Sequence, residues 1–428
     1  MSAAPSASAY QRQVDRWVAA EIHRGASTFD DLICALPGVY PTHAADSIER
    51  LRKAAIITKG QRRRATGRRE NEGSHRSATS SSLPPPHPLD FDWRFSPETI
   101  EKLVDRAIAA TQPGETVALL GTPSLHVAQL AKEHGRRFVL IDSNPLTVER
   151  IKTLDAHRTV YKRDLFVDPV PALDAAAVVA DPPWYDEYIE AFLWTASEVA
   201  RPDAQVFVSL PAVGTRPGSR EERKTFRSTA ERMAMRVEEV RLWDLAYVSP
   251  PFETNALAAA GWTGLPIDWR RGDLGILRTS GPNGPRPTQE TRETRWEEHS
   301  LGWVRIRVRR DPSTKVVDPS LEELVPGAVL PDVSRRHRFR EMANVWTSGN
   351  RVYRCQSPRL FLVILQAVVS GSNPRAAVAS TIGRTPTVEE DRAIAQSVSQ
   401  LRWIARIEGR ELAHHGWAPH RVRHKTAS

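Results

Sequence analysis

Residues 175–188 read AAAVVADPPWYDEY, an apolar run that ends abruptly in an acid, two prolines and two aromatic residues. The run 176–180 is short and consists of alanine and valine, which predicts a buried β-strand. Pro182 and Pro183 end this strand because neither has an N–H group to donate to a neighbouring strand. Asp181 and the backbone carbonyls of the turn therefore lie at the carboxyl end of a predicted parallel strand, where open α/β sheets bind their ligands.

Strands and helices alternate along the middle of the chain. We predict strands at 116–120, 137–141, 159–161, 176–180, 205–210, 236–246 and 274–278, and helices at 96–110, 123–134, 146–154, 185–200 and 221–233. This regular alternation indicates an α/β fold with a doubly wound sheet and right-handed crossover connections.

A glycine or an acid follows each of the first four predicted strands. Gly121 leaves the backbone bare, so that a ligand can approach closely. Asp142 is placed to bind both hydroxyls of a ribose, as the corresponding acid does in dinucleotide folds. Asp164 is placed to meet an adenine amino group, and Asp181 follows the fourth strand. Each residue alone is an ordinary end of a strand, but together they predict one crevice lined by polar groups.

The turn after the fourth strand suits chemistry on an amine. Asp181 can accept one amine hydrogen and the carbonyl of Pro182 can accept another, which points the nitrogen lone pair at an electrophile. Trp184 or Tyr185 can stack on a planar base. The alternative is a strand followed by a Pro-Pro turn with no role in chemistry.

Length and composition limit the protein class. A chain of 428 residues that is 40% hydrophobic and 26% charged predicts more than one folded domain. There is no apolar run long enough to span a membrane, and the first residues do not resemble a secretory signal. Cys34 and Cys355 lie far apart, which supports neither a disulfide framework nor a metal site and favours the cytoplasm. The net charge of +9 favours a polyanionic partner, and the alternative is the arginine-rich composition of proteins from GC-rich genomes, which needs no such partner.

Residues 1–59 resemble a winged helix-turn-helix, with three short helices followed by a strand at 56–58. The third helix would then be a recognition helix whose polar face carries Thr42, His43, Ser47, Arg50, Arg52 and Lys53. This predicts a nucleic acid partner, DNA more than RNA. The alternative is a helical module that docks on a protein partner.

Two linkers and a basic module complete the predicted organisation. Residues 60–88 are rich in Arg, Ser and Pro and predict a disordered basic linker, and residues 281–294 predict a second linker. Residues 295–428 predict an α+β module that recognises the target. Its basic residues Arg335 and Arg336 lie near Trp346, a mixture that suits single-stranded or flipped nucleic acid. The alternating strand at 302–309 places three further arginines on one face, either along phosphates or in solvent.

Residues 89–280 resemble the S-adenosylmethionine-dependent amino-methyltransferases, which carry D/N/S-P-P-Y/F/W after the fourth strand of a Rossmann-like sheet. Asp181-Pro182-Pro183-Trp184 fits this motif. The glycine loop reads GTPSL rather than GxGxG, and resembles a subgroup of N6-adenine type, some of whose eukaryotic members methylate lysines of elongation factors. The resemblance implies that Gly121, Thr122, Asp142 and Asp164 bind S-adenosylmethionine and that Asp181, Pro182, Pro183 and Trp184 are catalytic. From the residues themselves, we predict that Tyr185 and, in the basic module, Arg335, Arg336 and Trp346 contact the substrate.

The branched-polyamine synthases are a second family that the chain resembles. They pair an N-terminal winged helix with a similar sheet and a DPP motif, and they transfer aminopropyl groups to an amine. Their glycine loop is acidic (G-D-D-D), whereas Thr122-Pro123-Ser124 is not. In both families an amine nitrogen attacks a carbon bonded to a sulfonium, so the protein contributes mainly alignment and acceptors for positive charge.

We therefore predict methyl transfer from S-adenosylmethionine to an exocyclic amine, adenine N6 in nucleic acid. An adenine in duplex DNA would have to be flipped out of the helix to reach the crevice. The alternatives are methylation of protein lysines, aminopropyl transfer to a polyamine, and a DNA-binding protein without catalytic activity.

Overall fold

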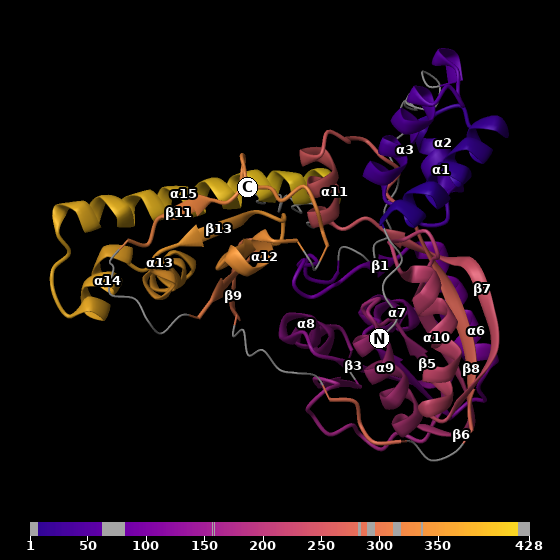
Figure 1. Ribbon diagram of the computed structural model, residues 1–428. Coiled ribbons are helices and arrows are strands. Elements are labelled where there is room, and N and C mark those ends of the chain that lie inside the picture. Colours follow the sequence, from indigo (N-terminus) through magenta and orange to yellow (C-terminus); the bar gives the residue numbers. More distant parts are fainter. Residues whose placement is uncertain are drawn as a thin grey trace, which may run out of the picture. The chain divides into compact units, whose positions relative to one another are not determined.

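The computed structural model describes residues 7–61, 82–155, 157, 159–280, 284–288, 296–310, 318–334 and 337–417. The chain forms two compact units (Figure 1). The first unit contains Met1–Leu83, Trp93–Ser249 and Gly264–Glu290, and the second contains Pro84–Asp92, Pro250–Thr263 and Thr291–Ser428. Two short segments that the sequence places within the sheet domain or at its border, 84–92 and 250–263, thus belong to the second unit.

Three helices open the first unit, as predicted: α1 (Ala7–His23), α2 (Phe29–Ala35) and α3 (Pro41–Lys53). The side chain of Thr28 caps α2 by accepting a hydrogen bond from the N–H of Asp31. The strand predicted at 56–58 is wrong, because these residues form a bend and the described residues 7–61 contain no strand. Ala55 turns the chain with φ of 55°, and Ile56 is 52% exposed rather than paired. A wing is therefore not part of this helical domain as described.

Eight strands form one mixed sheet in the order β1-β7-β8-β6-β5-β2-β3-β4. Their bounds are β1 (Arg94–Phe95), β2 (Thr116–Leu120), β3 (Arg137–Asp142), β4 (Val160–Lys162), β5 (Ala175–Ala180), β6 (Ala200–Pro211), β7 (Met235–Val248) and β8 (Arg270–Thr279). The five strands from β4 to β6 are parallel, as the alternation predicts. β8 lies antiparallel between β6 and β7, which strand alternation alone does not indicate.

Helices cover both faces of this sheet, so β5 is buried along its whole length. Residues of α6 (Pro97–Ala109), α7 (Pro123–Gln129) and α8 (Pro145–Leu154) pack in the core of one face. Residues of α9 (Asp186–Val199) and α10 (Ser219–Arg232) pack in the core of the other. Val178 and Val179, successive residues of β5, belong to different cores, as the period of two in a strand requires.

The order of the parallel strands places a switch point beside β2. This strand pairs with β3 on one side and with β5 on the other. The chain therefore reverses its direction of travel across the sheet between β2 and β5. In doubly wound sheets the ligand crevice lies outside the carboxyl ends of the strands at such a point, and here these ends lead into Gly121 and Asp181.

The second unit contains a five-stranded antiparallel sheet in the order β11-β13-β12-β10-β9. Its elements are α11 (Pro251–Ala259), β9 (Trp296–Leu301), β10 (Val304–Arg309), β11 (Leu321–Glu323), α12 (Phe339–Met342), β12 (Val345–Thr347), β13 (Val352–Cys355), α13 (Pro358–Ser370), α14 (Pro374–Ile382) and α15 (Val388–His414). A capping box of Thr387 and Glu390 begins α15. A separate α+β module is thus present, as predicted. Within the described residues, the search for a helix that is long and apolar enough to cross a membrane finds none.

Parts of both predicted linkers are packed. Leu83 and His87 are buried, although their neighbours in sequence are rich in Arg and Ser. The side chain of Arg286 donates hydrogen bonds to the carbonyls of Leu165 (2.6 Å) and Asp168 (2.5 Å). Composition is averaged over a whole segment. It therefore did not indicate that single residues such as Leu83 and Arg286 pack against the folded chain. Residues 62–81, 281–283 and 289–295 lie outside the described part of the chain.

Candidate functional site

The polar residues that follow the parallel strands lie along one edge of the sheet. The N–H of Gly121 donates to the carbonyl of Ile141 at 3.0 Å, and the N–H of Asp181 donates to the carbonyl of Leu120 at 3.1 Å. The N–H of Arg163 likewise donates to the carbonyl of Asp142 at 3.0 Å. The structure therefore brings the ends of β2, β3, β4 and β5 together, as predicted from the spacing of Gly121, Asp142, Asp164 and Asp181.

Gly121 occupies a position where only glycine fits without strain. Its φ is +63°, and a Cβ there would lie 3.1 Å from the Phe192 ring and 3.4 Å from the carbonyl of Asp181. The next residue, Thr122, is 2% exposed, and its hydroxyl is buried with no hydrogen-bond partner among the described residues. A buried hydroxyl without a partner is costly, and a polar group of a ligand at this loop would satisfy it.

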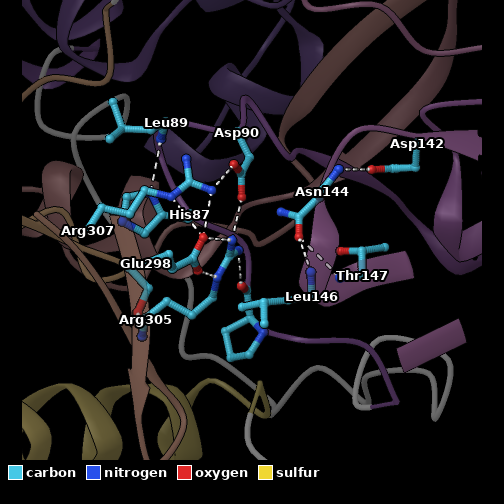
Figure 2. A network of polar contacts seen from close by, with 12 residues as sticks. His87, Leu89, Asp90, Asp142, Asn144, Leu146, Thr147, Glu298, Arg305 and Arg307 are labelled. Carbon is cyan, nitrogen blue, oxygen red and sulfur yellow. Dashed lines mark hydrogen bonds and ion pairs between the residues drawn. The ribbon is translucent and has the colours of Figure 1, made fainter. Parts of the chain in front are cut away.

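Asp142 is held at the end of β3 by a turn of its own chain. Its Oδ1 accepts the N–H of Asn144 at 2.7 Å. Asn144 in turn caps α8 by accepting the N–H groups of Leu146 and Thr147, and Figure 2 shows these bonds together. The Asp142 carboxylate is thereby fixed at the end of β3, and its contact with a ribose stays a prediction.

Asp164 lies in an exposed turn after β4. Its carboxylate accepts the N–H of Phe166 at 2.9 Å, and its own N–H donates to Asp168 at 2.8 Å. The Phe166 ring meets the Tyr188 ring edge to face, with centroids 5.2 Å apart. These contacts link the loop after β4 to α9 and place two aromatic rings beside the end of β4.

Asp181 receives two hydroxyl hydrogen bonds on the same carboxylate oxygen. One comes from Ser209 on β6 and the other from Tyr247 on β7, the latter at 2.8 Å. Burial, and next the Asp181 charge, raise the pKa of the Tyr247 phenol well above its ordinary value. Tyr247 therefore remains a hydrogen-bond donor at physiological pH, and the pair of hydroxyls fixes the rotation of the Asp181 side chain.

Trp184 is folded into the end of the sheet rather than presented for stacking. Its indole N–H donates to the Ser209 hydroxyl at 3.2 Å, and its ring meets the Tyr247 ring edge to face at 5.3 Å. A Cβ on Gly272 would lie 2.8 Å from the indole, so this glycine makes room for it. The ring of Trp184 thus supports Ser209, and stacking of Trp184 or Tyr185 on a planar base stays a prediction.

The remaining residues of the motif are held by a loop from β6. Pro182 is buried, and the Pro183 carbonyl accepts the N–H of Tyr185 at 2.7 Å within the turn. Arg216 donates to the Trp184 carbonyl, and its guanidinium lies 5.1 Å from the centre of the Tyr185 ring. This leaves the Pro182 carbonyl as the second candidate acceptor for an amine.

Ser209, Tyr247 and Arg216 are the site residues that the sequence did not reveal. Ser209 is 1% exposed and interrupts the apolar run VFVSLP, which is the one signal that could have singled it out. Tyr247 and Arg216 have no such signal, since their contact with the motif depends on strand order and on a loop.

Of the candidate substrate residues in the second unit, Trp346 lies within the described part of the chain, and it is not on a ligand surface. Trp346 is fully buried, its indole donates to Asn350 at 3.2 Å and the Arg340 guanidinium lies 4.7 Å from its ring. It therefore has no free face for a base, which corrects its predicted role. Arg335 and Arg336 lie outside the described residues.

The basic strand face predicted on β10 is paired internally. Arg305 is 1% exposed and binds Asp90, Glu298 and the carbonyl of Pro85, and Arg307 binds the same two acids (Figure 2). These arginines therefore neutralise buried carboxylates rather than lie along phosphates.

The polar face of α3 is also partly used. Ser47 and Arg50 both donate to Asp15 of α1, at 2.6 and 2.8 Å. Two of the six residues assigned to a recognition surface thus join the helices of the domain to each other.

Comparisons with known proteins show the fold alone. No family model matches the sequence, and no curated protein matches it. A solved mutein of the branched-chain polyamine synthase from Thermus thermophilus, in complex with N4-aminopropylspermidine and 5′-methylthioadenosine, is similar with a TM-score of 0.50 and 14% identity over 66% of this chain and 94% of that one. The unmodified synthase is similar with a TM-score of 0.50 and 14% identity, over 65% of this chain and 91% of that one. For a TehB-like SAM-dependent methyltransferase from Corynebacterium glutamicum, the TM-score is 0.29 and the identity is 15%, over 42% of this chain and 87% of that one.

The fold of this chain is therefore similar to that of the branched-chain polyamine synthase. At 14% identity, the similarity to the polyamine synthase shows a similar fold and does not show which reaction this chain catalyses.

Proposed function

We propose that the protein transfers an aminopropyl group from a sulfonium nucleoside to the nitrogen of a polyamine. The observation that carries this proposal is the charge of the crevice edge. The segments 121–125, 142–147 and 181–187 contain no Lys or Arg and four acids, Asp142, Asp181, Asp186 and Glu187, although the whole chain has a net charge of +9. The nearby cation Arg216 is paired with Glu222 at 2.8 Å, and Lys162 and Arg163 at the end of β4 are followed by the acids Asp164 and Asp168. Such an edge attracts a cation and repels phosphates.

The geometry of the motif supports an aliphatic acceptor over a nucleobase. Trp184 is turned toward Ser209 and Tyr247, so stacking on a flipped base would compete with these contacts. A flexible amine needs oxygen acceptors more than an aromatic platform, and Asp181 and the Pro182 carbonyl are such acceptors. The fold likeness to a synthase solved with N4-aminopropylspermidine adds support.

The donor fits the residues at the other strand ends. The bare backbone of Gly121, the unpartnered Thr122 hydroxyl, and the Asp142 and Asp164 carboxylates would hold its nucleoside part. When bound, the donor supplies a carbon attached to a positively charged sulfur, which leaves as a neutral thioether when the nitrogen–carbon bond forms.

The chain's own residues orient the acceptor and remove its proton. An aliphatic ammonium must lose a proton before its nitrogen can attack, since its pKa is about 10. Asp186 lies exposed in the first turn of α9 and can carry this proton to solvent. Asp181, held by two hydroxyls, accepts a remaining N–H and aligns the lone pair with the carbon under attack.

A specific observation favours methyl transfer as a second candidate. The loop Gly121–Leu125 carries hydroxyls but no carboxylate. A donor that lacks its carboxyl group presents an ammonium there, for which an acid would be the better partner. Intact S-adenosylmethionine carries its own carboxylate and suits a neutral loop.

Donor and acceptor can be separated in one experiment. Titration calorimetry would compare S-adenosylmethionine, its decarboxylated form and 5′-methylthioadenosine, and mass spectrometry would identify products from spermidine, DNA, RNA and protein. We expect aminopropylated spermidine with the decarboxylated donor, and loss of at least about 100-fold in turnover in Asp181→Asn with donor affinity retained. Asp105→Asn, on the exposed side of α6, is the matched control. A methylated product, or full turnover in Asp181→Asn, would overturn the proposal.

A further inference from the structure

The loop between β6 and α10 is fastened to the N-terminal helical domain at Gly214. Its N–H donates to the carbonyl of Pro37 at 3.0 Å, and its carbonyl accepts the Tyr10 hydroxyl at 2.9 Å. A Cβ at this position would lie 2.4 Å from the Pro37 oxygen. Both the N–H and the carbonyl of Gly214 are thus hydrogen-bonded to the N-terminal helical domain. A side chain at Gly214 would push this loop away from that domain.

A second contact supports the first. Gly38 has φ of +74°, and a Cβ on it would lie 3.1 Å from the carbonyl of Arg271 and 3.2 Å from Ala212. The ring of Tyr40 meets the ring of Trp269 edge to face at 5.6 Å. The helical domain therefore touches the chain at the end of β6 and at the start of β8.

Both contacted segments lie at the edge of the sheet that carries the site. β6 runs parallel to β5, so that Ala212 follows its carboxyl end just as Asp181 follows that of β5. β8 is antiparallel to β6, with Gly272 opposite Pro211, so its first residues lie at the same edge.

The loop between β6 and α10 contacts the turn 181–185 through the side chain of Arg216. Arg216 is two residues after Gly214, donates to the Trp184 carbonyl and to Glu222 (2.8 Å), and lies over the Tyr185 ring. Its position relative to the turn 181–185 thus depends on a loop whose anchor is on the N-terminal domain.

We propose that the N-terminal helices are a positioning element of the transferase site, in which Tyr10 and Pro37 hold Gly214 and thereby keep Arg216 on the turn 181–185. This role does not depend on which amine the site accepts, although its kinetic consequence rests on the proposed function. The domain then serves the reaction through its inner contacts rather than through nucleic acid.

Two variants of the full-length protein test the coupling. Tyr10→Phe removes only the hydroxyl, and Gly214→Ala introduces the clash with Pro37 without requiring a left-handed backbone. Arg216→Ala removes the link to the turn, and Arg52→Ala, whose side chain pairs with Glu49 within α3, is the matched control. Hydrogen exchange by mass spectrometry at residues 181–188 gives a readout that needs no substrate.

We expect faster exchange at 181–188 in Tyr10→Phe, Gly214→Ala and Arg216→Ala, and unchanged exchange in Arg52→Ala. The acceptor KM should rise about threefold to tenfold in Tyr10→Phe, the value of one neutral hydrogen bond, with kcat and donor affinity little changed. Wild-type exchange rates at 181–188 in both Tyr10→Phe and Gly214→Ala would overturn the inference, whatever the activity. An inactive wild-type protein with the expected exchange pattern would count against the proposed function alone.

Discussion

The Tyr247 hydroxyl donates a 2.8 Å hydrogen bond to the Asp181 carboxylate, although the two residues lie 66 positions apart. Asp181 follows β5, whereas Tyr247 is near the end of β7, three strands away in the sheet. Ser209 on the intervening β6 donates to the same oxygen. The far strands of the sheet thus hold the orientation of the carboxylate that aligns the acceptor nitrogen in the proposed reaction.

Removal of the Tyr247 hydroxyl should slow the reaction and leave donor binding unchanged. A hydrogen bond to a charged group contributes about 1.5–3 kcal/mol, so we expect Tyr247→Phe to lower kcat/KM by about 10-fold to 100-fold. Steady-state kinetics with the acceptor, and calorimetry with the donor, measure the two effects. Tyr161→Phe, at an exposed tyrosine on β4, is the control. An equal loss of donor affinity would show that Tyr247 maintains the fold of the crevice rather than the carboxylate.

A methyl group at Gly121 should impair donor binding. Gly121→Ala places a Cβ 3.1 Å from the Phe192 ring in a backbone with φ of +63°. We expect donor affinity to fall at least about tenfold, since a non-glycine residue in this region costs on the order of 1–3 kcal/mol and the added carbon narrows the approach. Gly135→Ala is a close control, because Gly135 has φ of +66° and its nearest neighbour is 3.6 Å away at Pro113. It should lose stability but retain donor affinity, and equal affinities in the two variants would contradict the assignment of the loop.

The sequence was most informative where a local pattern has one structural outcome. Parallel strands that alternate with helices end at one edge, so Gly121, Asp142 and Asp181 could be placed together from their spacing alone. The partners of Asp181 could not, because Ser209 and Tyr247 meet it only through the order β7-β8-β6-β5. In that order, β8 lies antiparallel between β6 and β7, and no local sequence pattern indicates this placement.

Charge patterns were the least reliable guide. The alternation in WVRIRVRR placed Arg305 and Arg307 on one face correctly, yet that face is closed by Asp90 and Glu298. A basic residue looks the same in sequence whether its partner is a phosphate or an acid brought from another strand. The prediction for Trp346 failed for the same reason. An aromatic residue in the sequence does not show whether it belongs to a core, as Trp346 does, or to a binding site.

Arg305 should stabilise the second unit rather than bind nucleic acid. Its guanidinium lies 2.7 Å from Asp90 and also binds Glu298, and its removal would leave two carboxylates in a largely buried position. Breaking a buried ion pair on one side costs about 3–5 kcal/mol of unfolding free energy. Denaturant unfolding followed by tryptophan fluorescence should show this loss in Arg305→Ala. Arg309→Ala, on the same strand with a single bond to the Glu341 carbonyl, should lose less than about 1 kcal/mol. Equal losses in the two variants would contradict the buried role.

His87 should make the second unit sensitive to mild acid. It is fully buried, its Nδ1 accepts the N–H of Leu89 at 3.2 Å and its Nε2 lies 3.3 Å from the Trp346 carbonyl (Figure 2). Burial, followed by the nearby charges of Arg307 and Arg305, lowers the pKa of His87 well below its usual value of 6.5.

The sign of the pH effect follows from proton binding. A histidine whose pKa is lowered on folding binds its proton in the unfolded state first, so its stabilising contribution is complete above pH 6.5 and falls as the pH decreases toward the folded pKa. We expect the unfolding free energy to fall by up to about 1.4 kcal/mol per pH unit between pH 6 and 5. His87→Asn keeps an acceptor for the Leu89 amide but cannot titrate, so it should flatten this part of the curve. The exposed residue His23, changed to Asn, should leave the slope as in the wild type, and the same slope in His87→Asn would show that another group carries the acid sensitivity.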